Sequence, residues 1–105
     1  MVKRPDPRLS HQGLQVLRVF YEQPKESFAG ADVWRRTGIL AGTLYPILAR
    51  FERVGWLDSE WEDLDPSQAG RPRRRLYRLT AKGFNKTNEA LARLGLAAGR
   101  PAWMS

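Results

Sequence analysis

Apolar residues recur at helical spacing along residues 42–55. Placed on a helix at 100° per residue, they fall within one arc of roughly 120°. This apolar face consists of Leu44, Ile47, Leu48, Phe51 and Val54. The opposite face carries small residues first and cations later, namely Gly42, Pro46, Ala49, Arg50 and Arg53, with Thr43 at its edge. The pattern predicts a helix whose outer face suits a nucleic-acid groove, although an ordinary amphipathic surface helix has the same periodicity.

Pro46 constrains where this helix begins. Proline has no N–H to donate and clashes with the carbonyl group four residues earlier, so we expect it in or near the first turn. The helix is then predicted to begin between Ala41 and Thr43, with Thr43 as a candidate N-cap whose hydroxyl serves the backbone or a phosphate. Gly55 is predicted to end the helix.

The N-terminal part is predicted to be an arm followed by a helix. Residues 1–9 are polar and contain two prolines, so we expect a mobile arm whose cations either touch phosphates or are solvated. Ser10 is a candidate N-cap for a helix that runs to about Gln23 and has an apolar arc of roughly 220°. That arc is wider than one small core needs, so it implies a second packing partner, either another helix of the chain or the same helix of another subunit.

A short second helix is expected over residues 30–37. Ser27 caps or precedes it, Val33 and Trp34 are its expected anchors, and Gly38 ends it. The short link from Gly38 to the next helix is bounded by glycines, which is typical of a helix-turn-helix.

After Gly55 the period changes from that of a helix to that of a strand. Residues 56–64 alternate between two sides, residues 65–72 are rich in turn formers, and residues 73–79 form the predicted returning strand. Thr80 is expected to open a last helix. Its stripe consists of Phe84, Thr87, Leu91 and Leu94.

The elements together predict a mostly α fold with a two-stranded β wing. This is a winged helix-turn-helix with three N-terminal helices, a β-hairpin and one C-terminal helix. We expect the winged-helix domain over residues 10–79, a C-terminal helix and dimerisation element over residues 80–98, and a tail over residues 99–105 that includes Trp103.

Composition favours a small domain with a polyanionic partner. The 105 residues are 42% hydrophobic, enough for one modest core, and 18 Lys and Arg against 11 Asp and Glu give a net charge of +7. Nucleic acid is therefore the first expected partner. No apolar run approaches the roughly 18 residues of a membrane span, and residues 1–8 lack a secretory signal, so we expect a cytoplasmic protein with no membrane partner.

The residues offer no catalytic or metal-binding set. There is no cysteine, and His11 is the single histidine, so neither a zinc site of the cysteine type nor a histidine-rich site is possible. Ser27 and Ser59 lack a neighbouring histidine that would activate them. We expect no enzyme activity and no cofactor.

The arginines of the hairpin have two possible roles. Acidic residues fill the partner strand, so we expect Arg75 and Arg78 mainly to pair across the hairpin. Arg71 and Arg73 lie beside the glycine and proline of the loop and are expected to contact DNA, with Arg74 open between the two roles.

On the predicted third helix, Arg50 and Arg53 are candidates for contacts with bases or phosphates. The alternative for Arg53 is to complement the helix dipole. Tyr45 lies at the flank of the same face, where its phenol reaches a phosphate or has a purely structural role.

Two motifs carry a family resemblance. Thr-Leu-Tyr-Pro opens the predicted third helix at residues 43–46, and Gly-Arg-Pro-Arg at residues 70–73 leads into Tyr-Arg-Leu-Thr at residues 77–80. In this order they resemble the PadR family of bacterial transcriptional regulators, and the likeness covers about residues 10–95.

The resemblance implies a winged helix that binds double-stranded DNA as a homodimer on an inverted-repeat operator, usually as a repressor. It places Thr43 and Tyr45 on the recognition helix and residues 71–73 on the wing. Two features depart from the family pattern. The link between the second and third helices is shorter, and one helix follows the wing where many members have a longer dimerisation domain. The sequence does not identify an effector.

The candidate DNA-binding residues are Thr43, Tyr45, Arg50, Arg53, Arg71, Arg73 and Arg74. The candidate dimer interface consists of Leu14, Leu17, Tyr21, Leu91 and Leu94. Two other functions stay open. One is a winged helix that binds an acidic protein partner through its arginines, and the other is a binder of single strands or RNA. The latter would stack bases on Trp34, Trp56 or Trp61, which we expect instead to pack in the core and on the sheet.

Overall fold

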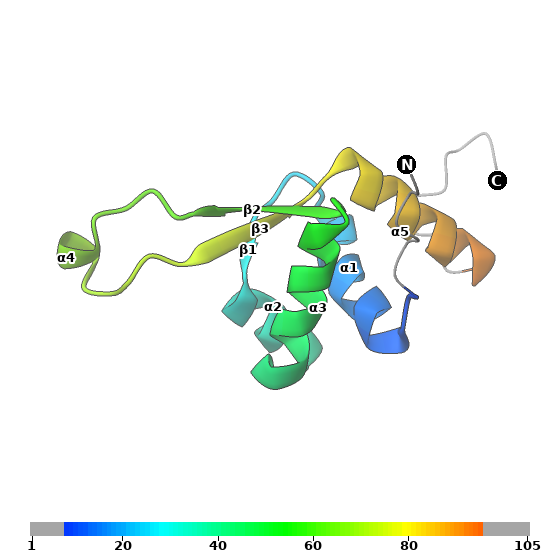
Figure 1. The fold of residues 1–105 in the computed structure, drawn as a ribbon, viewed down its shortest axis with the longest axis horizontal. Helices are drawn as coiled ribbons and strands as arrows, with labels where there is room; N and C mark the ends of the chain where they lie inside the picture. The colour runs from blue at the N-terminus through cyan, green and yellow to red at the C-terminus, as the bar shows by residue number, and fades with distance from the viewer. Residues whose placement is uncertain (1–7, 96–105) are drawn as a thin grey trace.

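The computed structural model describes residues 8–95 of the chain. The expectations for residues 1–7 of the arm, and those for residues 96–105, including Trp103, lie outside the described residues. The elements follow the order α1 (His11–Glu22), β1 (Phe28–Ala29), α2 (Gly30–Thr37), α3 (Ala41–Arg53), β2 (Leu57–Trp61), α4 (Pro66–Ala69), β3 (Arg75–Leu79) and α5 (Ala81–Arg93), as Figure 1 shows. The predicted fold class, mostly helical with a small antiparallel sheet in a winged helix-turn-helix, is confirmed.

Side-chain caps begin α1, α2 and α5. The Ser10 Oγ accepts a hydrogen bond from Gly13 N at 3.0 Å, and Thr80 Oγ1 accepts one from Gly83 N at 3.0 Å, so both predicted N-caps are confirmed. At α2 the Asp32 carboxylate accepts from Ala29 N at 2.9 Å, so the start of this helix is fixed by its own first turn rather than by Ser27.

Helix α3 begins where Pro46 predicted, but its cap differs. Leu40 is the N-cap and the helix starts at Ala41, so Thr43 lies inside the first turn and is not the cap we expected. Pro46 is tolerated inside the helix. Gly55 has φ 79°, a left-handed value that favours glycine, and it turns the chain from the end of α3 towards β2 as predicted.

The wing belongs to a sheet of three strands, not two. The strand order is β1-β3-β2 and both pairings are antiparallel, with Phe28 opposite Tyr77 and Trp61 opposite Arg75. Strand β1 has only two residues, which is too short to show a period of two. The predicted loop also contains α4, a single turn at the far tip of the wing (Figure 1).

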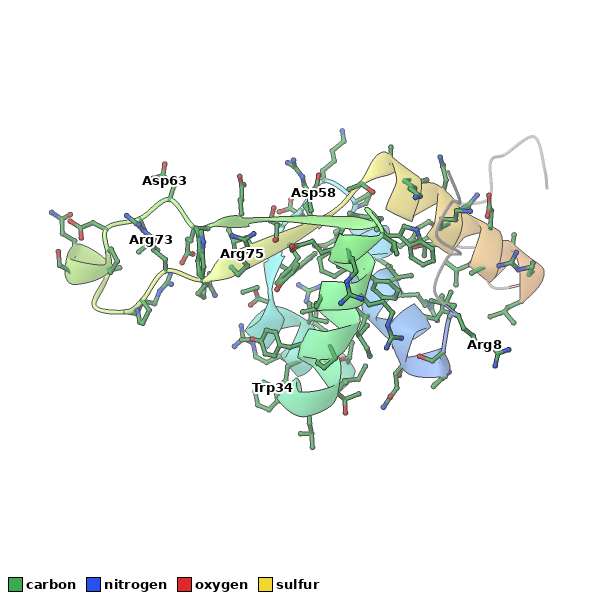
Figure 2. The ribbon with its side chains drawn as sticks, viewed as in Figure 1. Arg8, Trp34, Asp58, Asp63, Arg73 and Arg75 are labelled. Atoms are coloured by element: carbon green, nitrogen blue, oxygen red, sulfur yellow. The ribbon has the colours of Figure 1, made fainter. Side chains whose placement is uncertain are left out.

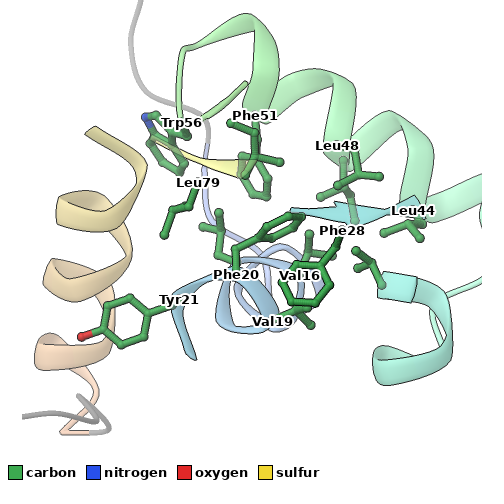
Figure 3. Close-up of a cluster of buried hydrophobic side chains, with 14 of the residues drawn as sticks. Val16, Val19, Phe20, Tyr21, Phe28, Leu44, Leu48, Phe51, Trp56 and Leu79 are labelled. Carbon is green, nitrogen blue, oxygen red and sulfur yellow. The ribbon is translucent and has the colours of Figure 1, made fainter. Parts of the chain in front are cut away.

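The core lies between the helices and the inner face of the sheet (Figure 3). Phe20 packs edge-on against Phe28 with ring centroids 5.5 Å apart, and Phe51 stacks on Trp56 at 5.3 Å. Trp56 is buried as expected, whereas Trp34 is 46% exposed and Trp61 is 62% exposed. The expectation that Trp34 anchors α2 in the core, and that Trp61 is buried, was wrong. Val33 alone of the two expected anchors is buried.

Helix α5 is the second packing partner that the wide apolar arc of α1 required. The Tyr21 hydroxyl donates to Asn88 Oδ1 at 2.8 Å, and the Tyr21 ring stacks on Phe84 with centroids 4.9 Å apart. Of the two partners that the arc left open, the structure therefore supplies a helix of the same chain.

This packing shows which of the predicted interface residues lie at the surface of the single chain. Leu17, Tyr21 and Leu91 are buried within the chain, where the core and α5 cover them, so they do not form an outer surface. Leu14 is half-buried, and Leu94 is 59% exposed. Helix α5 also ends at Arg93, earlier than the expected residue 98, because Gly95 takes a left-handed conformation with φ 69°.

Candidate nucleic-acid interface

The outer face of α3 is exposed along its whole length. Thr43, Arg50 and Arg53 are exposed, while the apolar residues of the opposite face are packed in the core. The neighbouring outward positions, Gly42, Pro46 and Ala49, are exposed as well. The face that the periodicity assigned to solvent or DNA is therefore free of contacts that would hold it against the body of the domain.

Tyr45 joins α3 to the start of α2. A Cβ atom at Gly30 would lie 2.6 Å from Cε1 and Cζ of the Tyr45 ring, and closer still to its hydroxyl. Only glycine leaves room for this approach. The ring therefore packs on the first residue of α2, while the side chain as a whole stays about half exposed. Tyr45 thus packs against α2 and still reaches the surface.

An open cleft separates α3 from the wing. Helix α3 contributes Ala49, Glu52 and Arg53, and the two wing strands contribute Trp61, Arg75 and Tyr77. Helix and wing thus face the same space, and each brings one guanidinium to it, Arg53 from the helix and Arg75 from β3.

A chain of side-chain contacts through Ser59 connects residues of the two walls of this cleft. The Ser59 hydroxyl donates to the Glu52 carboxylate and accepts from Arg75 Nε at 2.9 Å. The Arg75 guanidinium also lies over the Trp61 ring, 5.2 Å from its centroid. Burial, and then the charge of Glu52, raise the pKa of Tyr77 above its ordinary value. Arg75 is therefore a cleft residue held by Ser59 and Trp61.

The wing loop is organised around Glu62. Its carboxylate accepts two hydrogen bonds from Arg71, at 2.6 and 3.1 Å, one from Arg74 Nη2 at 3.1 Å and one from the Arg74 backbone N–H at 3.2 Å. Hydrogen bonds from Arg71, then from Arg74, lower the pKa of Glu62 to about 2. Arg73 turns the other way along the loop and donates from Nε to the Leu64 carbonyl at 2.8 Å.

The expected division of roles among the wing arginines was therefore wrong in one respect. Arg71 and Arg74, rather than Arg75 and Arg78, make the wing ion pairs within residues 8–95. Arg71, Arg73 and Arg74 are nevertheless exposed, so all three stay available to a partner. Arg78 lies opposite Asp58 in the strand register without an ion pair to it in the described part of the chain.

The acids of β2 and the guanidinium of Arg75 lie on opposite faces of the sheet. Asp58 and Glu60 line a depression with Arg78 on the face away from α3, and Figure 2 shows Asp58 on that side. Arg75 lies on the face towards α3. The alternation along β2 that the sequence displayed thus separates Asp58 and Glu60 from the cleft, where Glu52 of α3 is the one lining acid among the described residues. Arg75 was the cleft residue that sequence reasoning missed, and its place in that alternation was the available signal.

Other classes of site are not found in the described part of the chain. Among residues 8–95, no three His, Cys, Asp or Glu side chains gather as they would around a metal ion. No helix within these residues has the length and apolar character needed to cross a bilayer.

Comparison with solved structures gives the same fold in known regulators. A PadR-like transcription factor from Bacteroides fragilis superposes with a TM-score of 0.65 at 26% identity, covering 80% of this chain and 82% of that one. A PadR family regulator from Eggerthella lenta gives 0.64 at 29% identity, covering 81% and 75%. MepR of Staphylococcus aureus, solved as a complex with DNA, gives 0.65 at 17% identity, covering 83% and 64%, and shows the shared fold alone.

Comparison with curated proteins gave no match. The model of the transcriptional regulator PadR-like family matches residues 31–89, more than half of the chain. These residues run from α2 to α5 and include α3, the cleft and the wing. The family consists of transcriptional regulators and not of enzymes. The chain belongs to the PadR-like family of transcriptional regulators, with a DNA-binding winged helix.

Proposed function

We propose that the chain represses transcription by binding as a homodimer to an inverted-repeat operator in double-stranded DNA. Helix α3 enters the major groove with Thr43 and Arg50 towards the bases, and the wing arginines bind the phosphate backbone. Tyr45 contacts a phosphate at the edge of the groove. The bound dimer excludes the polymerase from the promoter, so the protein acts in the cytoplasm, where that DNA is.

The observation that carries this proposal is the cleft between α3 and the wing. It has one guanidinium on each wall, Arg53 and Arg75, against one carboxylate, Glu52, which accepts a hydrogen bond from Ser59, while Asp58 and Glu60 line a separate depression. A phosphate of the duplex backbone is attracted to both guanidiniums. MepR, which has this fold, was solved on DNA, which supports the same use of the fold here.

The test compares two arginines of the same charge. Arg53→Ala removes a cation from the cleft, and Arg78→Ala removes one from the opposite face of the sheet. We expect Arg53→Ala to weaken binding to a duplex selected from a random pool and to reduce the slope of log K against log salt by about 1. Arg78→Ala should change the affinity for the duplex and the salt slope much less. Equal effects of the two variants, or equal affinity of the unmutated protein for selected and random duplexes, would contradict the proposal.

The same selection from a random duplex pool also tests the alternative in which the chain binds an acidic protein. If the chain uses its arginines for an acidic protein, the unmutated chain will select no duplex, or will bind it without dependence on ionic strength.

A second candidate function rests on the exposed tryptophans. Trp34 and Trp61 present large aromatic surfaces to solvent, as proteins that stack unpaired bases do. One face of Trp61 is already covered by the Arg75 guanidinium, which favours the duplex. Quenching of tryptophan fluorescence by single-stranded oligonucleotides but not by duplex would reverse this preference.

A further inference from the structure

Glu62 has an unusual place for an acid in a DNA-binding wing. It directly follows β2, at the base of the loop that carries Arg71, Arg73 and Arg74. Its own backbone N–H donates to the Arg74 carbonyl at 2.9 Å, so the position is fixed by the ladder as well as by the side chain. Glu62, at the start of the loop, therefore contacts Arg74 at its end through both backbone and side chain.

The two arginines cover the carboxylate without being covered themselves. The Glu62 side chain is only 14% exposed, whereas the Arg71 and Arg74 side chains are each 42% exposed. A guanidinium has five N–H groups. Arg71 directs Nη1 and Nη2 at Glu62 and also donates from Nη1 to the Pro72 carbonyl at 3.2 Å, which leaves its Nε–H and one Nη2–H outside these contacts. Arg74 directs only Nη2 at Glu62, so most of its N–H groups are not used by that carboxylate.

These contacts change what the wing presents to a partner. Two long side chains that would otherwise sample many rotamers are held side by side on one anchor. A partner that binds both then loses less conformational entropy on association, which is the advantage of preorganisation. The partner that fits two adjacent guanidiniums with free N–H edges is a row of phosphates.

We propose that Glu62 is a positioning residue for DNA binding, which holds Arg71 and Arg74 as a fixed pair whose outward N–H groups bind phosphates of one DNA strand. The proposal rests on the proposed function, because it concerns how the wing binds the duplex. Glu62 itself makes no contact with DNA. It acts through the two arginines.

An argument from net charge alone predicts the opposite effect of Glu62→Gln on DNA affinity. Glu62→Gln raises the net charge of the chain from +7 to +8, and a more positive wing should bind DNA more tightly. Positioning predicts weaker binding, because the glutamine amide replaces one acceptor oxygen by a donor and cannot hold two guanidiniums. Asp63→Asn is the matched control. Asp63 is the next residue, is exposed, and has no ion pair in the described part of the chain, so the variant changes the charge alone.

The experiment is fluorescence anisotropy with a labelled duplex of mixed sequence, over a series of salt concentrations. We expect Glu62→Gln to weaken binding about fivefold to 150-fold, the range for losing the order of two rotamer-rich side chains. Its salt slope should fall by about 1 to 2, as if phosphate contacts were lost although both arginines remain. Asp63→Asn should bind as tightly as the unmutated chain or more tightly, with no fall in slope.

A double-mutant cycle shows whether Glu62 acts through these arginines. In an Arg71→Ala, Arg74→Ala background, Glu62→Gln should cause no further weakening. Further weakening there, or Glu62→Gln binding as tightly as Asp63→Asn, overturns the proposal. Failure of the unmutated chain to bind any duplex would instead overturn the proposed function, so the two failures are distinguishable.

Discussion

The hydroxyl of Ser59 on β2 donates a hydrogen bond to the carboxylate of Glu52 on α3, and so links the wing directly to the recognition helix. The same hydroxyl accepts from Arg75, which places a cation of the cleft on the same link. A winged helix must present its helix and its wing to one duplex at a fixed angle. In this chain a single small side chain contributes to that angle.

Ser59→Ala should therefore affect binding more than stability. Removing the hydroxyl leaves Glu52 and Arg75 without their shared partner, at a cost of about 1 kcal/mol in the free energy of unfolding. Thermal denaturation measures that loss, and anisotropy with duplex should show weaker binding because the wing is less well placed. Ser27→Ala is the control, since Ser27 is an exposed serine that does not line the cleft. Identical binding by the two variants would show that the link has no role in recognition.

Long amphipathic stretches were predictable from the sequence. The buried face of α3 and the end of that helix at Gly55 follow from apolar spacing and from one glycine, and both are confirmed. The caps at Ser10 and Thr80 follow from side-chain chemistry within one turn. These features depend on residues three or four positions apart, where a linear pattern contains the whole interaction.

Contacts set by the fold of a loop were not predictable in the same way. Strand register alone pairs Asp58 with Arg78, whereas the wing loop turns back through α4 and brings Arg71 and Arg74 to Glu62. The wide apolar arc of α1 predicted a second packing partner for this helix but did not identify it. Because α5 supplies that partner, Leu17 and Tyr21 are buried within the single chain.

Gly30→Ala should loosen the junction between α2 and α3. The new methyl group would occupy the space of the Tyr45 ring, so the ring must move, and we expect a loss of about 1 to 3 kcal/mol in the free energy of unfolding. Tyr45→Ala should make room, so the double variant should lose less than the sum of the two single variants. Gly42→Ala is the control, because nothing lies within 4 Å of a Cβ there and alanine favours a helix. Chemical denaturation of the four variants gives the comparison, and additive losses would contradict it.

The carboxyl of Glu62 should titrate far below the usual range. Its pKa in the folded chain is about 2, below the ordinary 4.5, because Arg71 and Arg74 donate to the charged form. A lowered pKa means that the stabilising effect is present above pH 4.5 and is lost as the pH falls towards 2. NMR titration of the side-chain carboxyl carbon should place the midpoint near 2. Arg71→Ala should raise that midpoint, since Arg71 is the largest cause of the shift. A midpoint unchanged by Arg71→Ala would show that the pair does not form in solution.

Substitutions at Leu94 and at Leu17 test dimer assembly and folding separately. Leu94 is 59% exposed at the end of α5, so Leu94→Glu should leave the free energy of unfolding of the single chain nearly unchanged. If the homodimer forms through this end of α5, the same variant should sediment as a monomer, because it places a charge in an apolar contact. Leu17→Ala should instead cost about 2 to 5 kcal/mol of stability through the cavity that it leaves in the core. Analytical ultracentrifugation and thermal denaturation of both variants test this division. A Leu94→Glu protein that remains a dimer would move the interface away from α5, and an unmutated chain that sediments as a monomer would remove the homodimer from the proposed function.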